Sequence, residues 1–195
     1  MLRTKRRTAL VCAALMVATL MWLPQPASSG TFPGFNGRIA FVGDADGDEE
    51  IYTIFPNGTG LTQLTVDTIS DSSPAWNVDG TLIAWEANGN IQTMPWDGSY
   101  QQLATTMGNC WSPTWSASGR IAFQHAGNIW SVLPDSTGLR QLTSSGKDSN
   151  PEWSPSSTVI AFSRGTSDKI FIMNANGTNV RRVAGAESTP AYVNS

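Results

Sequence analysis

Residues 73–85, SPAWNVDGTLIAW, contain the pattern that decides the fold. A Ser-Pro pair precedes an aromatic residue, a polar turn and an apolar triplet that ends in a second aromatic residue. The pattern returns as SPTWSASGRIAF at 112–123 and as NPEWSPSSTVIAF at 150–162, and STPAY at 188–192 repeats its beginning. The prolines are spaced 39, 38 and 39 residues apart. Self-similarity at a fixed period of this size indicates a repeat architecture.

One proline and one aromatic residue anchor each copy of the pattern. These repeat anchors are Pro74, Trp76, Pro113, Trp115, Pro151, Trp153, Pro190 and Tyr192. Because a single 39-residue unit cannot bury a large aromatic ring by itself, we expect these rings to pack between neighbouring units.

Each unit also contains the signals of four short strands. The apolar triplet leads to an alternating run, of which IYTIF at 51–55 and IWSVL at 129–133 are examples. Alternation with period 2 in segments rich in Ile, Val and aromatic residues is typical of half-buried strands. Asn-Gly and Asp-Gly pairs follow these runs and favour hairpins, and a segment such as LTQLT at 61–65 closes the unit.

These signals predict an all-β fold, a β-propeller of four four-stranded blades, because stacking such sheets around an axis buries both faces of each sheet. We expect one propeller domain over 30–195, with blades at about 31–66, 72–105, 112–143 and 150–184 and the start of a fifth unit at 188–195. FPGFNG at 32–37 is expected to supply the first strand of the first blade. We expect an open, incomplete ring, because the fifth unit has no further strands; a ring closed by the terminal strand is the alternative.

Residues 1–29 have the pattern of a secretory signal peptide. A basic start, an apolar run at 8–23 and small residues at Ala27 and Ser29 follow one another. The sequence therefore predicts a secreted or periplasmic protein with no membrane association after cleavage, and retention of the segment as an anchor is the alternative. Without this segment the formal charge is −7, which disfavours nucleic-acid binding. Cys110 is the only cysteine left, so no internal disulfide is expected.

The repeats resemble those of the TolB-type β-propeller family. SPAWNVDGTLIAW, SPTWSASGRIAF and NPEWSPSSTVIAF carry the resemblance, together with NGTGLTQLT and STGLRQLT. It covers residues 31–192 and concerns the propeller part only. The resemblance implies an exported protein that binds other molecules.

The segment GDADGDEEIY at 43–52 contains the densest group of acids. Asp44, Asp46 and Asp48 alternate as calcium ligands often do. An EF-hand loop counted from Asp44 would need Gly and Glu where Glu49 and Phe55 stand. We therefore expect a hairpin turn here and no cofactor, with a weak calcium site as the alternative.

The same turn belongs to a wider acidic region of the first blade. No Lys or Arg lies between Arg38 and Arg120. The candidate binding residues are Asp44, Asp46, Asp48, Glu49, Asp67 and Asp71, and Glu50 contributes to the same charge pattern. Such an asymmetric field favours a cationic partner or an ion, and we expect the partner to be another protein or a cell-envelope component. A solvated rim with no partner is the alternative.

These features favour a non-enzymatic binding or scaffold module that works through the loops of one propeller face. His125 is the only histidine, and no Gly-x-Ser-x-Gly elbow is present. The alternatives are a metal-dependent carbohydrate-active enzyme of the lyase-type propeller class and a truncated propeller remnant with no independent activity. An open ring would also expose a blade face and so allow self-association.

Overall fold

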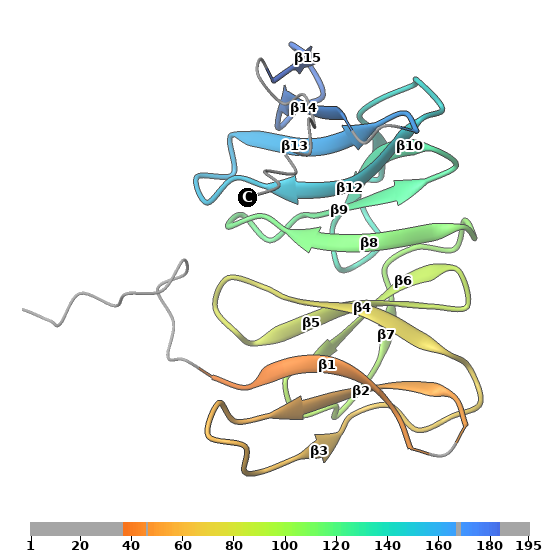
Figure 1. Cartoon of the computed structure of the whole chain (residues 1–195), viewed down its shortest axis with the longest axis vertical. Coiled ribbons are helices and arrows are strands. Elements are labelled where there is room, and N and C mark those ends of the chain that lie inside the picture. Colours follow the sequence, from red (N-terminus) through yellow and green to blue (C-terminus); the bar gives the residue numbers. More distant parts are fainter. Residues whose placement is uncertain (1–36, 46, 167–168, 184–195) are drawn as a thin grey trace, which may run out of the picture.

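A computed structural model describes residues 37–45, 47–166 and 169–183, and every regular element within them is a β-strand (Figure 1). The first sheet contains β1 (Ile39–Asp44), β2 (Glu49–Ile54) and β3 (Thr62–Gln63). The second contains β4 (Asp71–Trp76), β5 (Leu82–Ala87), β6 (Asn90–Pro95) and β7 (Gln102–Leu103). The third contains β8 (Cys110–Trp115), β9 (Ile121–His125), β10 (Asn128–Val132) and β11 (Arg140–Gln141). The fourth contains β12 (Asp148–Trp153), β13 (Val159–Arg164), β14 (Lys169–Asn174) and β15 (Arg181–Arg182).

Each sheet is an antiparallel meander, and the four sheets stack in chain order as propeller blades do (Figure 1). The first strands β4, β8 and β12 pack against the preceding blade. The all-β propeller prediction is thus confirmed. The first and fourth blades lie at opposite ends of the stack, so the described residues form an open arc rather than a closed ring.

Several predicted features lie outside the described residues. They are the signal peptide at 1–29, all but the last residue of the expected first strand at 32–37, Asp46, and the fifth unit at 188–195 with its anchors Pro190 and Tyr192. The first blade therefore has three described strands, and the other three blades have four.

The repeat prolines lie at a bulge in the first strand of each complete blade. In β4, Ser73 and Pro74 together face the single residue Trp85 of β5, because Ser72 pairs with Glu86 and Ala75 with Ala84. Ser73 has a φ of 54°. The same shift occurs in the other two complete blades. Proline has no N–H to donate to a sheet ladder, and the bulge places it where the ladder requires none.

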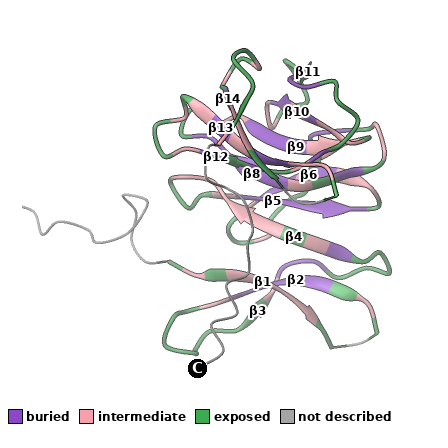
Figure 2. Ribbon diagram, turned by 45° about the horizontal axis from the view of Figure 1, so that its top comes forward, coloured by how far each residue is buried: buried purple, intermediate pink, exposed green. Residues whose placement is uncertain are grey.

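The hydrophobic core lies between the blades. Trp115 is buried among Ala84 and Ile91 of the preceding blade, and its indole N–H donates to the Ala75 carbonyl at 3.0 Å. Trp153 is buried in the same way between the third and fourth blades. Trp76 is half-buried against the first blade. Figure 2 shows β5 and β9, in the two middle blades, as largely buried.

The outer face of the fourth blade is open among the described residues. Ala122 and Ile129 of the third blade are fully buried by the fourth blade. The corresponding residues of the fourth blade are Ala161, which is half-buried, and Ile170, which is 39% exposed. The difference arises because no described strand packs on this face of the fourth blade.

Candidate functional site

One end of the blades is built by a repeated hydrogen bond between a hairpin and the next connection. In the second blade, the side-chain oxygen of Asn90 accepts a hydrogen bond from Gly108 N–H at 3.0 Å. In the third blade, Asn128 accepts one from Gly146 N–H at 2.9 Å. Each bond ties the turn between the second and third strands to the connection that leads to the next blade. We call this end of the blades the connection face.

A buried threonine reinforces the same junction in three blades. The hydroxyls of Thr65, Thr105 and Thr143 accept hydrogen bonds from backbone N–H groups 14 residues earlier, at 2.8 to 2.9 Å. All three threonines are buried. The same hydrogen bonds therefore fix the backbone of the connection face in successive blades. Side chains that differ between blades occupy equivalent positions on it.

The first blade has a carboxylate where the next two blades have an amide. Glu50 takes the place of Asn90 and Asn128, and its Oε1 accepts a hydrogen bond from Asp67 N–H at 2.9 Å. Thr65 donates its hydroxyl hydrogen to the other oxygen of Glu50. Glu50 is 0% exposed. One carboxylate oxygen from each of Asp48, Glu50 and Asp67 lies within 4.8 Å of the others.

The other predicted acids of this region have different positions. Asp44 is exposed and accepts a hydrogen bond from Gly47 N–H at 3.0 Å, so it shapes the turn. Glu49 is exposed beside the cluster, and Asp46 lies outside the described residues. The structure thus joins Asp48 to Glu50 and Asp67 in one group of possible metal ligands, a set that does not include Asp44.

Asp71 occupies a special position at the start of β4. It is 1% exposed, and its Oδ2 has no hydrogen-bond partner. The pKa of Asp71 is raised to about 6, chiefly by burial; hydrogen bonds with the side chains of Thr65 and Trp85 act to lower it, and the charges of Asp67 and Glu50 act to raise it. A buried, weakly compensated carboxyl group therefore lies next to the acidic cluster.

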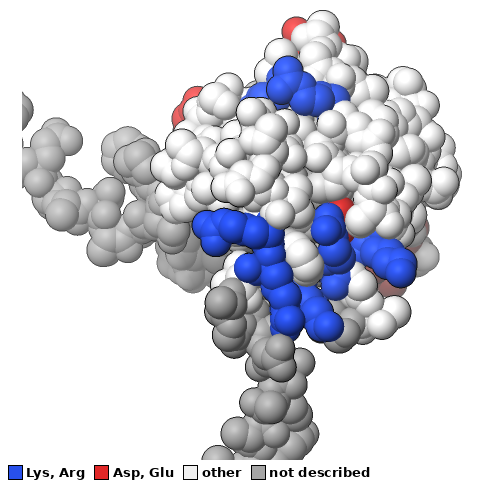
Figure 3. Space-filling view, turned by 90° about the horizontal axis from the view of Figure 1, so that it is seen from above, with Lys and Arg blue, Asp and Glu red and all other residues white. Residues whose placement is uncertain are grey.

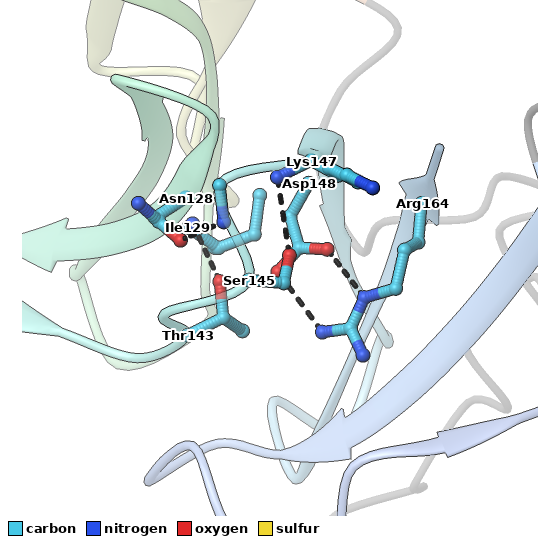
Figure 4. A network of polar contacts seen from close by, with 8 residues as sticks. Asn128, Ile129, Thr143, Ser145, Lys147, Asp148 and Arg164 are labelled. Carbon is cyan, nitrogen blue, oxygen red and sulfur yellow. Dashed lines mark hydrogen bonds and ion pairs between the residues drawn. The ribbon is translucent and has the colours of Figure 1, made fainter. Parts of the chain in front are cut away.

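The equivalent acid of the fourth blade is compensated. Asp148 begins β12, three residues before its repeat proline as Asp71 is, and pairs across the sheet with Arg164. Arg164 Nε lies 2.6 Å from Oδ1 and Nη2 lies 3.0 Å from Oδ2 (Figure 4). Burial of Asp148 works to raise its pKa, but bonds from Arg164, Thr143 and Ser145 outweigh it and hold the pKa below its usual value.

In the third blade the same position holds Cys110, opposite His125. Burial raises the pKa of the Cys110 thiol. His125 Nδ1 lies 2.8 Å from the carbonyl oxygen of Gly108, and the His125 ring contacts Trp130 edge-on. A buried thiol with a raised pKa is a poor nucleophile. The surroundings of Cys110 and His125 therefore favour a role in packing.

Charge is distributed unevenly along the arc. Arg38 bonds Thr53 and Thr62 at the opposite end of the first blade, so it does not face the acidic cluster. Figure 3 views the end of the stack formed by the fourth blade and shows Lys and Arg side chains gathered across it. The first blade is therefore acidic at its connection face, and the fourth blade is basic.

Comparisons with known proteins agree with this architecture. The family model of the TolB beta propeller domain matches residues 25–193. The chain belongs to the TolB β-propeller domain family. A TolB homolog of Chlorobium luteolum is 34% identical over 151 residues, which cover 72% of this chain and 35% of the relative. This chain thus spans about a third of the length of that relative.

Solved structures agree at the level of the fold. TolB from Acinetobacter baumannii has a TM-score of 0.64 at 18% identity, over 76% of this chain and 41% of that one. A chain of the nidogen/laminin complex has a TM-score of 0.67 at 14% identity, over 80% of this chain and 64% of that one. Among the described residues, no helix is long and apolar enough to cross a membrane.

Glu50 is the residue that the sequence patterns underrated. It stands at the start of an alternating strand, and alternation alone gives it no role. The available signal was the alignment of the repeats, which places Glu50 with Asn90 and Asn128. Three residues that fill one place and bond the connection in the same way identify a shared structural position, and only Glu50 among them is charged.

Proposed function

We propose that this chain is an exported, non-enzymatic binding or scaffold module of the TolB propeller family. Its partner binds at the connection face of the first blade, and is a protein or cell-envelope component that presents a cationic segment. Membership of the TolB propeller family supports a binding or scaffold role only at the level of the family, and the specific role is argued from the site because one fold hosts many functions.

The observation that carries this proposal is the concentration of negative charge at one end of the first blade. Asp44, Glu49 and Asp67 are exposed there, and Asp48 is half-buried. No Lys or Arg occurs from residue 39 to residue 119. Exposed charges of one sign on a rigid surface attract an opposite partner and set its orientation, with an effect that salt weakens.

The test compares two charge reversals of the same size. Glu49→Lys changes an exposed acid of the connection face, and Asp79→Lys changes an exposed acid in the turn at the other end of the second blade. Immobilised wild-type and variant chains are incubated with an envelope fraction of the producing cell, and the retained proteins are identified and quantified.

We expect a component that wild type and Asp79→Lys retain, that Glu49→Lys loses, and that elutes as the salt concentration rises. Equal retention by all three chains would show that the acidic face is not the binding surface. Retention of nothing would instead support a propeller remnant without independent activity.

A further inference from the structure

We propose that Asp48, Glu50 and Asp67 form a site for a divalent cation, with calcium as the ion that fits best. One carboxylate oxygen from each residue lies within 4.8 Å of the other two. Calcium binds oxygen at about 2.4 Å, so two of its ligands can be no more than about 4.8 Å apart. The three residues come from the turn after β1, from β2 and from the connection to β4, and so surround one point from three segments.

Two of these carboxylates are held in place by the fold. Glu50 is buried and accepts bonds from Thr65 and from Asp67 N–H. Asp67 accepts a bond from Ile69 N–H at 2.7 Å. These neutral donors orient the carboxylates and neutralise none of their charge, and an oxygen that accepts one such bond retains a lone pair for a metal ion.

Asp71 supplies the independent evidence that a cation belongs here. It is 1% exposed and its Oδ2 accepts no hydrogen bond; the polar side chains that lower its pKa, Thr65 and Trp85, are neutral, and Glu50 and Asp67 add charge of the same sign. The equivalent Asp148 is neutralised by Arg164, whereas the residue opposite Asp71 is Ala87. Buried charges are paired or bind metals, and the described part of the first two blades offers Asp71 no arginine or lysine on this face.

This ligand set differs from the one that residue spacing suggested. Of Asp44, Asp46 and Asp48, only Asp48 belongs to the group. In the first blade Glu50 already makes the link to the connection that Asn90 and Asn128 make in the next two blades. The proposed ion would add a second link, between Asp48 in the turn after β1 and Asp67 in the connection. The proposal does not depend on the binding partner proposed above, since it concerns the stability of the junction.

The test measures thermal unfolding of the full chain by tryptophan fluorescence, after removal of metal with EDTA and dialysis. Calcium chloride is titrated to about 10 mM, a range that reaches the weak sites of extracellular modules. Potassium chloride at matched ionic strength provides the control for screening. Terbium luminescence sensitised by tryptophan gives a direct binding signal, because Trp85 lies beside Asp71.

We expect calcium to raise the unfolding midpoint by a few degrees, as a ligand specific for the native state does. Asp67→Asn should weaken calcium binding about tenfold or more, since it removes one of three charged ligands. Asp67 is exposed, so this variant is expected to fold. Glu49→Gln is the matched control, because it makes the same charge change beside the cluster and should bind as wild type does.

Two results would overturn the proposal. One is the absence of any calcium-dependent shift beyond that of potassium chloride, with no saturable terbium signal. The other is an equal loss in Glu49→Gln and Asp67→Asn, because diffuse attraction to an acidic surface, not a defined site, would then explain the binding.

Discussion

Replacement of Arg164 by Gln tests whether this arginine compensates the buried carboxylate of Asp148 at the start of β12. Asp148 has no exposed side-chain surface, and the Arg164 side chain is 27% exposed. The guanidinium also stacks on Phe171 at 4.6 Å from the ring centroid. The substitution leaves a buried carboxylate with only its weaker hydrogen bonds.

The expected cost follows from this geometry. Removing one partner of a buried ion pair costs about 3–5 kcal/mol, because the remaining charge is uncompensated. Partial exposure lets water replace some of the lost interaction, so we expect Arg164→Gln to lower the free energy of unfolding by about 2–3 kcal/mol. Asp148→Asn should cost less, and the double variant should show a coupling of about 1.5 kcal/mol in a double-mutant cycle.

Urea unfolding monitored by tryptophan fluorescence at pH 7 supplies the four stabilities. The pKa of Asp148 lies below its usual value in the folded chain. The ion pair therefore stabilises the fold above the unfolded pKa of about 3.9, and this contribution is lost as the pH falls through the lower folded pKa. The deficit of Arg164→Gln should shrink in that acid range.

Arg140→Gln is the matched control, because Arg140 is exposed on β11 and the same charge is removed. Its effect should stay within about 0.5 kcal/mol. A coupling below about 0.5 kcal/mol between Arg164 and Asp148, or an equal cost for both arginine substitutions, would refute the view that Arg164 compensates a buried acid.

Three further predictions address packing, the end of the arc and catalysis. Trp115→Ala should lower the free energy of unfolding by about 3–5 kcal/mol in urea denaturation, since the ring is buried between blades; a near-neutral effect would remove its packing role. The full chain should self-associate as its concentration rises in sedimentation experiments. Ile170→Glu should reduce the self-association, because Ile170 lies on the open face of the fourth blade. A compact monomer at every concentration, of about 16–17 Å radius of gyration, would argue against self-association. A glycan-cleavage screen with added divalent ions should detect no turnover, and robust turnover abolished by His125→Ala would establish the enzymatic alternative.

The sequence was sufficient to predict the fold because the same strand and turn pattern occurs in several consecutive repeats. Any one copy of the Pro-aromatic pattern is a weak signal, but copies in register remove the ambiguity of short strands. The bulge at Ser73 and Pro74 was not predicted. It depends on two residues facing one across the sheet, and this pairing becomes visible only when both strands are placed.

The sequence could predict which region of the chain is acidic, but it could not predict which acidic residues lie together. Spacing along the chain grouped Asp44 with Asp48 because they alternate, whereas the fold brings Asp48 together with Asp67, 19 residues later. The contact between Asp48 and Asp67 forms because the turn after β1 folds against the connection to β4. A repeating pattern along the sequence cannot predict such a contact. Charge patterning could place the acids at the connection face of the first blade, where the structure gathers Asp48, Glu50 and Asp67, since a net field depends on composition more than on exact geometry.

One structural position illustrates how this fold can vary its chemistry without changing its scaffold. The residue three places before the repeat proline is Asp71, Cys110 or Asp148 in successive blades, and each begins a first strand in the same register. The fourth blade balances the buried acid with Arg164 across the sheet. The third blade avoids the charge with a thiol that burial keeps protonated. The second blade retains the acid opposite Ala87, and the carboxylates of the first blade add negative charge around it. The third and fourth blades thus avoid an unpaired buried charge with residues of their own. At the junction of the first and second blades, a bound cation would compensate the charge of Asp71 and of the carboxylates around it.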